Sequence, residues 1–291
     1  MQLVICNFRQ RVAAKTSAAH QITNYQLPNY KFMDVASYLE RIGYEGPRAP
    51  TLETLRALHR RHMLTVPFEN LDIHLGRPIV LDEAAFFDKI VRQRRGGFCY
   101  ELNGLFAALL RELGYDLDLL SGRVSNELGR FGPEFDHLVL LVRLDGQQWI
   151  ADVGFGDSFL EPLALDGKEQ SSGGMLYFID SWPEGLILLR EENGTWSSKY
   201  VFTLTPHRLE EFAGMCVYHQ TSPSSTFPRA RICSRATPQG RITLSEMRLI
   251  QTMNGERTER MLESEAEYGQ ALVEYFGIEL PNLDWKPLRQ W

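Results

Sequence analysis

A single cysteine at the start of an apolar helix constrains this chain more than any other feature of its sequence. Two glycines and an aromatic residue lead into Cys99. From Leu102 to Leu113 apolar residues recur at the spacing of one helical face, and Gly114 follows where a helix would end. Free N–H groups and the helix dipole favour an anion in the first turn. The pattern predicts a core helix that places Cys99 where a nucleophile would sit.

The helix alone leaves two interpretations of Cys99 open. Gly96 and Gly97 carry no side chains, so that another molecule can approach the thiol closely, as a nucleophile requires. Alternatively, Cys99 is an ordinary buried cysteine, which is common and inert. The choice depends on whether the chain supplies a base.

A predicted β-hairpin supplies a histidine and an aspartate. Asp145 and Gly146 are the signal of a two-residue turn. In the register that this turn imposes, His137 lies opposite Gly154, and Asp152 lies on the same face within diagonal reach. A one-residue slip would separate the two side chains. The register predicts a contact between Asp152 and His137, although each residue alone also fits a structural role in a core or a turn.

The chemistry of a thiol explains why Cys99 needs this pair. With a pKa near 8.5, a free thiol is only about 3% ionised at pH 7. A helix N-terminus contributes at most ~2 kcal/mol, or roughly 1.5 pKa units. A histidine that accepts the proton, held by a carboxylate, completes the ionisation. We therefore expect Cys99, His137 and Asp152 to act together.

Five segments resemble those of the arylamine N-acetyltransferase family. They are residues 95–103 around Cys99, Asp136-His137, residues 152–156, residues 66–71 and residues 221–227. The resemblance runs from about Met33 to the C-terminus. It departs at the first 32 residues, which have no counterpart in the short family pattern. It departs again at Asp157-Ser158, where another glycine often follows Gly156.

The resemblance implies an α+β multidomain fold with a papain- or transglutaminase-like Cys-His-Asp core. The periodicity of the chain agrees, because helical spacing gives way to alternation after Gly114. We expect a basic, flexible extension (1–32), a helical domain with the nucleophile (33–114), an antiparallel β-barrel with the histidine and aspartate (115–213) and an α/β lid (214–291).

The implied reaction is ping-pong acetyl transfer from acetyl-coenzyme A through an acetyl-cysteine. The acceptor would be the nitrogen of an arylamine or hydrazine, or the oxygen of an N-hydroxy form. By resemblance, Phe68, Phe155 and Phe227 wall the acceptor pocket, and their alternative role is core packing. Arg95 is expected in a buried ion pair with Glu69. An amide synthase of the same family, a papain-like thiol hydrolase and an inactive binding domain are the alternatives.

A basic cluster in an acidic chain suggests where the coenzyme binds. The formal charge is −6, and four basic residues without an acid in the first 32 leave −10 for the rest. Arg229, Arg231 and Arg235 would share one face of an unbroken strand at 230–236. Arg229 and Arg231, with the hydroxyls of Thr221, Ser222, Ser224 and Ser225, are the predicted coenzyme contacts. The alternative is a solvated strand face.

Composition narrows the remaining possibilities. The acidic chain makes nucleic acid an unexpected partner, and no apolar run approaches the roughly 20 residues of a membrane span. Four scattered cysteines favour a reducing, cytoplasmic setting without a disulfide framework. His59 and His62 have no third ligand nearby, so we expect no metal and interpret them as solvated helix residues. The chain is expected to act as a monomer or homodimer.

Overall fold

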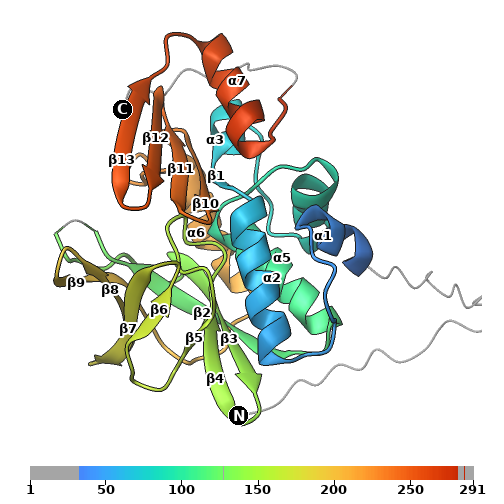
Figure 1. Ribbon diagram of the computed structural model, residues 1–291, viewed down its shortest axis with the longest axis vertical. Coiled ribbons are helices and arrows are strands. Elements are labelled where there is room, and N and C mark those ends of the chain that lie inside the picture. Colours follow the sequence, from blue (N-terminus) through green and yellow to red (C-terminus); the bar gives the residue numbers. More distant parts are fainter. Residues whose placement is uncertain (1–32, 127, 281–284, 286–291) are drawn as a thin grey trace, which may run out of the picture. The chain divides into compact units, whose positions relative to one another are not determined.

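Helices dominate residues 35–112 of the computed structural model, which describes residues 33–126, 128–280 and 285 (Figure 1). They are α1 (Val35–Arg41), α2 (Leu52–Thr65), α3 (Leu71–Leu75), α4 (Glu83–Phe87), a π-helical turn (Asp88–Arg92) and α5 (Cys99–Glu112), with the short strand β1 (Phe68–Glu69) after α2. Asp34, Thr51 and Asp82 cap α1, α2 and α4 by accepting a backbone N–H three residues on, at 2.8 to 3.2 Å. The predicted extension 1–32 lies outside the described residues.

Helix α5 begins at Cys99, as predicted, and Gly114 follows its end with a φ of 88°. Every residue from Cys99 to Leu110 is buried. The predicted apolar stripe therefore describes a helix enclosed by protein rather than one at the surface. It contacts α1 and α4 and the strands β2 (Asp116–Val124) and β3 (His137–Leu144).

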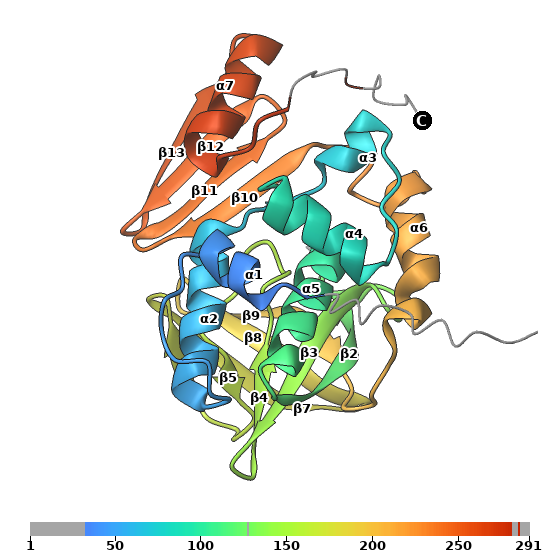
Figure 2. The ribbon, with the colours of Figure 1, turned by 90° about the vertical axis from the view of Figure 1, so that its right-hand side faces the viewer.

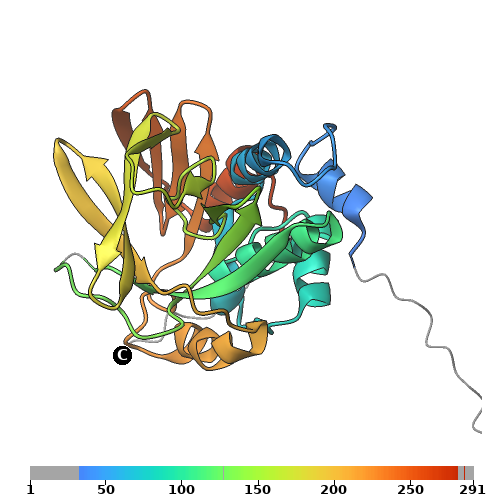
Figure 3. The same ribbon diagram turned by 90° about the horizontal axis from the view of Figure 1, so that it is seen from below.

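An antiparallel sheet of eight strands follows α5 and curves into a nearly closed barrel (Figure 3). Beyond β2 and β3 its strands are β4 (Gln147–Ala151), β5 (Leu163–Ala164), β6 (Gln170–Ser172), β7 (Met175–Trp182), β8 (Gly185–Glu192) and β9 (Thr195–Phe202). Their order is β5-β4-β3-β2-β9-β8-β7-β6. Gln170 joins the two ends, because its side-chain amide exchanges two hydrogen bonds with the backbone of Ala164, at 2.6 and 2.9 Å. The predicted α+β class with a barrel is confirmed.

The β3–β4 hairpin has the predicted register. Asp145 and Gly146 both adopt positive φ, at 49° and 75°, as a tight hairpin turn requires. Leu144 pairs with Gln147, and the ladder continues to Leu140 and Ala151. It ends there, so that the expected pairing of His137 with Gly154 does not form and residues 152–154 leave the sheet.

A five-stranded antiparallel sheet with a helix forms the last part of the described chain (Figure 2). Its order is β1-β10-β11-β12-β13, where β10 is Ile232–Thr237, β11 Gly240–Ser245, β12 Arg248–Met253 and β13 Glu256–Met261. Helix α7 (Glu265–Phe276) packs its Tyr268 and Leu272 with Cys233 and Leu244 of the sheet. Strand β13, which we did not predict, is exposed along its whole length. Through β1, residues 68–69 join this C-terminal sheet to the helical part of the chain.

A 3₁₀ turn (Leu209–Phe212) and α6 (Ala213–Thr221) connect the barrel to the five-stranded sheet. The described residues from Met33 onward form a single compact unit. The three domain ranges after residue 32 stay a prediction. Among the described residues, no helix combines the length and apolar character needed to cross a membrane.

Candidate active site

Cys99 is the first residue of α5 and is buried, with 3% of its surface exposed. The N–H of the preceding Phe98 donates to the carboxylate of Glu101 at 3.0 Å, which fixes the entry of the chain into the helix. The backbone N–H groups in the first turn of a helix have no intrahelical acceptor and point toward its N-terminus. In α5 this is the end at which Cys99 lies.

Gly96 and Gly97 serve chain packing, so our interpretation of them as an open approach to the thiol was wrong. A Cβ at Gly96 would lie 2.0 Å from the carbonyl oxygen of Pro67, and one at Gly97 would lie 2.8 Å from Cβ of Glu101. Gly97 bridges to Phe68 of β1. Neither glycine lines a cavity beside Cys99. They let the segment before α5 lie directly against β1.

His137 and Asp152 make the predicted contact. Nε2 of His137 lies 2.8 Å from Oδ2 of Asp152, and both side chains are buried. Because Nε2 faces the carboxylate, Nδ1 is the ring nitrogen that does not contact Asp152. The contact arises without a strand ladder at this point, since the chain turns out of β4 directly after Ala151.

Asp152 accepts four hydrogen bonds. Besides His137, Oδ2 accepts from the hydroxyl of Tyr200 at 3.0 Å, and Oδ1 accepts from the amide of Asn103 at 2.8 Å and the N–H of Gly154 at 3.0 Å. Burial opposes the charge of this carboxyl. The neighbouring His137 and the hydrogen bonds outweigh burial and lower the pKa of Asp152 below its ordinary value.

Asn103 is a positioning residue that we did not predict. It lies one turn after Cys99 on α5 and is fully buried. Its amide nitrogen donates to Leu138 O at 2.6 Å as well as to Asp152, and its oxygen accepts the N–H of Val153 at 2.8 Å. One side chain thus ties the nucleophile helix to the histidine strand and the aspartate segment. The sequence signal that could have identified Asn103 is a polar residue within an otherwise apolar helix.

His59 and His62 are fully buried, so our interpretation of them as solvated helix residues was wrong. Nε2 of His59 accepts the backbone N–H of Asp152 at 3.1 Å, and its Nδ1 lies 3.0 Å from Leu160 O. Burial lowers the pKa of His59 to about 4 and lowers that of His62 as well. His59 is therefore neutral at pH 7 and supports Asp152 from behind, through α2.

A buried ionic cluster lies under the N-terminal end of α5. Arg95 binds Glu69 at 2.7 Å, as predicted, and Asp72 at 3.1 Å. Lys89 binds Asp72 at 2.8 Å and Glu101 at 2.9 Å. Burial opposes the charge of Lys89, but these carboxylates, with Glu69, raise its pKa above the ordinary value. Two cations and three carboxyl groups hold α3, the π-helical turn and α5 together.

A cavity of about 180 Å³ opens beside Cys99 and His137. Its walls include the three predicted aromatic residues, and the full lining is Phe68, Cys99, Val124, Asp136, His137, Gly154, Phe155, Gly156, His219, Thr226 and Phe227. The rings of Phe68 and Phe227 lie 6.1 Å apart, and that of Phe155 lies 5.3 Å from His137. Burial raises the pKa of the Cys99 thiol well above its ordinary value.

The structure divides the predicted coenzyme residues into two groups. The strand begins at Ile232, not at residue 230, so the premise of a shared strand face was wrong. Arg231 is buried, binds Glu246 and Glu265, and covers the ring of Tyr268 at 4.4 Å. Its guanidinium is therefore not available to a phosphate. Ser225 is also buried, with its hydroxyl 3.1 Å from Nδ1 of His219.

The other predicted coenzyme residues stay accessible. Thr221, Ser224 and Arg229 are exposed, and Ser222 is half-buried. Arg229 donates to the backbone oxygens of Ser224 and Ser225, at 2.9 and 2.8 Å. It keeps its remaining N–H groups for another partner. These four residues remain predictions for the coenzyme.

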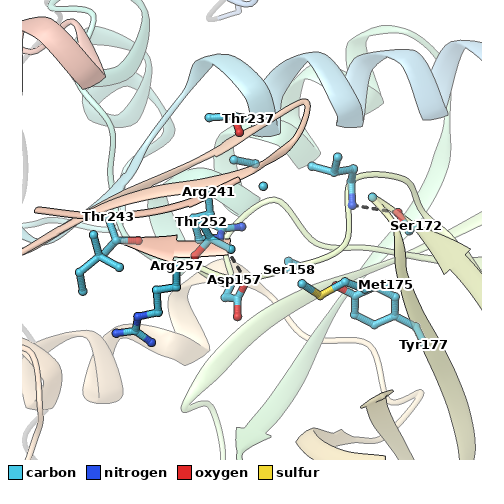
Figure 4. A pocket seen from close by; sticks show the side chains of 15 residues that line it. Asp157, Ser158, Ser172, Met175, Tyr177, Thr237, Arg241, Thr243, Thr252 and Arg257 are labelled. Carbon is cyan, nitrogen blue, oxygen red and sulfur yellow. Dashed lines mark hydrogen bonds and ion pairs between the residues drawn. The ribbon is translucent and has the colours of Figure 1, made fainter. Parts of the chain in front are cut away.

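A second cavity, of about 270 Å³, is lined by residues of both sheets (Figure 4). Gly156 lines the first cavity and Asp157 the second, so the two share this loop. Asp157 binds Arg190 at 2.6 Å and Arg241 at 3.1 Å. The departure at Asp157-Ser158 from the glycine expected there thus gives the loop two ion pairs.

Comparison with known proteins places this site in a family. The N-acetyltransferase family model matches residues 51–285. The chain is 35% identical, over 285 residues, to the pineal gland isozyme NAT-3 of arylamine N-acetyltransferase from Gallus gallus, covering 85% of this chain and 95% of that relative. It is 33% identical, over 250 residues, to proansamycin X synthase of Amycolatopsis mediterranei, covering 82% and 95%.

A solved structure agrees with these matches. The arylamine N-acetyltransferase of Mycobacterium marinum in complex with CoA superposes with a TM-score of 0.79 at 33% identity, covering 84% of this chain and 93% of that one. Fold and sequence together define an acyltransferase. The chain belongs to the arylamine N-acetyltransferase family.

Replacing Gly154 with alanine is expected to disrupt the site. A Cβ at this position would lie 2.7 Å from the amide of Asn103 and 2.8 Å from Cys99 O, so the segment 152–154 has to move away from α5. We expect Gly154→Ala to lower the free energy of unfolding by about 1–3 kcal/mol and to slow alkylation of Cys99.

Gly214→Ala is the matched control. A Cβ at Gly214, within α6, meets nothing within 4 Å. This variant should be stabilised by about 0.5–1 kcal/mol. Urea unfolding and iodoacetamide kinetics measure both variants, and equal behaviour of the two would contradict the close approach of Gly154 to α5.

Proposed function

We propose that Cys99 carries an acetyl group from acetyl-coenzyme A to an aromatic amine or hydrazine by a ping-pong mechanism. The observation that carries this proposal is the single aromatic cavity that holds both Cys99 and His137, with His137 anchored on Asp152. The family membership supports acetyl transfer, and the CoA complex of the M. marinum relative supports the donor.

In the first half-reaction the Cys99 thiol passes its proton to Nδ1 of His137. The thiolate attacks the thioester carbonyl, and the resulting oxyanion accepts from the backbone N–H of Cys99. The C–S bond to coenzyme A then breaks. His137 returns its proton to the departing thiolate, leaving acetyl-Cys99 and free coenzyme A.

In the second half-reaction the acceptor nitrogen attacks the acetyl carbon of acetyl-Cys99. Neutral His137 removes a proton from this nitrogen, and the C–S bond to Cys99 breaks as the amide forms. His137 then reprotonates Cys99 or shares the proton with it for the next cycle. Asp152 keeps Nε2 of His137 protonated and stabilises the imidazolium in both halves.

The size and lining of the cavity support a small aromatic acceptor. A dry cavity of about 150 Å³ holds benzene, and the cavity here measures about 180 Å³ between Phe68, Phe155 and Phe227. Proansamycin X synthase is a relative, so amide synthesis is the second candidate. The small cavity favours a single-ring acceptor over a large one.

We expect acetyl-coenzyme A alone to acetylate the protein once, at Cys99. Intact mass should rise by the mass of one acetyl group with release of one coenzyme A, and an arylamine should then discharge it. Cys216 and Cys233, which are buried and line no part of the cavity, are internal controls. Cys99→Ser should fold and take up no acetyl group. Acetate release without an acceptor, at the rate of arylamine transfer, would indicate a hydrolase instead.

The pH dependence of alkylation tests the role of His137. In the wild type we expect iodoacetamide to modify Cys99 well below pH 8, because imidazolium stabilises the thiolate. In His137→Ala the imidazolium is gone, while burial, together with the charges of Asp136 and Asp152, still raises the pKa of Cys99. The inflection should therefore move above the ordinary value of about 8.5. A wild-type profile with one step near 8.5 would contradict the ion pair.

Arg229 tests the proposed coenzyme contact. Arg229→Ala should raise the KM for acetyl-coenzyme A by roughly three- to tenfold, more at low salt, because a phosphate loses a charged partner. The small donor p-nitrophenyl acetate should be affected much less. Arg208→Ala, at an exposed position beside Glu211, is the matched control. An equal loss with both donors would assign Arg229 to holding its loop, since it also binds Ser224 and Ser225.

A further inference from the structure

A second imidazole–carboxylate pair lies in the wall of the cavity that holds Cys99. Four of the lining residues can carry charge or exchange a proton: Cys99, Asp136, His137 and His219. The mechanism uses Cys99 and His137. Asp136 and His219 remain unexplained, and no lysine or arginine from the described part of the chain lines this cavity.

Both ring nitrogens of His219 have polar partners within the protein. Its Nε2 lies 3.2 Å from Oδ1 and 3.2 Å from the backbone oxygen of Asp136. Both are acceptors, so Nε2 carries the proton. Its Nδ1 lies 3.1 Å from the hydroxyl of Ser225, which donates to it in the neutral ring. Both ring nitrogens are thus engaged, and the ring packs edge-on against Phe227 at 5.2 Å.

Asp136, in contrast, keeps hydrogen-bonding capacity. Its Oδ2 accepts the N–H of Val124 at 3.1 Å, and its Oδ1 lies 3.2 Å from Nε2 of His219, which bonds the backbone oxygen of the same residue. Each carboxylate oxygen has two lone pairs, so one remains on each. The side chain is 14% exposed and lines the cavity. A carboxylate is therefore held in a fixed orientation beside the acceptor space.

We propose that Asp136, positioned by His219, selects acceptors by charge. It favours aromatic amines whose second substituent is cationic or donates a hydrogen bond, and it disfavours those that carry a carboxylate. The inference rests on the proposed acetyl transfer and specifies its acceptor. The physical reason is that, while the acceptor binds and His137 is neutral, a carboxylate in a small cavity attracts a positive substituent and repels a negative one.

Three single-ring amines of similar size test this selection: 4-(aminomethyl)aniline, which is cationic at pH 7, neutral 4-methylaniline and anionic 4-aminobenzoate. We expect kcat/KM to fall in that order in the wild type. In Asp136→Asn, which removes the charge and whose single amide oxygen can still accept from Val124, each of the two ratios should shrink by on the order of tenfold. The comparison of ratios cancels the different intrinsic reactivities of the amines.

The same readout tests the positioning role of His219. His219→Leu should reduce both ratios, because Asp136 loses its donor, whereas His219→Gln keeps a donor and should restore them. Loss of fold alone would not move a ratio between acceptors. These two variants also keep the inference testable if Asp136→Asn fails to fold. Unchanged ratios in both Asp136→Asn and His219→Leu would overturn the inference.

Acetylation of Cys99 without an acceptor separates this inference from the proposed function. If wild-type protein takes up no acetyl group from acetyl-coenzyme A, the proposed function fails. If it does, and 4-aminobenzoate reacts as well as 4-(aminomethyl)aniline, only the selection by Asp136 fails. After burial, Asp136 also contributes to the raised pKa of Cys99. That effect acts on all acceptors alike and leaves the ratios unchanged.

Discussion

The buried carboxylate of Asp152 is the interaction on which the rest of the structure depends. A buried charge costs several kcal/mol unless hydrogen bonds and a partner compensate it. Here the hydrogen-bond donors to the carboxylate come from α5, β3, β9 and the turn after β4. In addition, His59 of α2 accepts the backbone N–H of Asp152. All these elements must be in place together for the carboxylate to stay ionised. The orientation of His137 is thus a consequence of completed folding.

A second polar centre acts on the other side of Cys99. The cluster of Arg95, Lys89 and their three carboxylate partners fixes the chain that enters α5. Removal of one member of such a cluster leaves an uncompensated charge in the interior. Asn103 and Asp152 fix the helix one turn later. The thiol therefore sits between two rigid anchors, which favours a reaction that depends on the distance between sulfur and imidazole.

Sequence reasoning succeeded where the determining interactions are local. Periodicity and end signals located α5, and the turn at Asp145-Gly146 determined the hairpin register. The predicted contact of Asp152 with His137 also forms, although Asp152 lies beyond the end of the paired strands. Sequence reasoning failed where the partner comes from far along the chain. The residues around Arg231 do not predict its ion pair with Glu265, and those around His59 do not predict its hydrogen bond with Asp152. Strand β13 was not predicted because it consists mainly of charged residues and lacks the alternation of apolar and polar residues that indicates a strand.

The composition of β13 has a consequence for how copies of this chain behave toward one another. As the edge strand of the described sheet it presents one row of backbone N–H and C=O groups that no other described strand pairs. Glu256, Arg257, Glu259 and Arg260 keep the whole strand wet and charged, so a strand from a second copy would have to desolvate them to pair. In the barrel, the two edge strands β5 and β6 are joined by the hydrogen bonds between Gln170 and Ala164. These two features oppose strand-by-strand growth into fibrils at the β13 edge and at the ends of the barrel sheet.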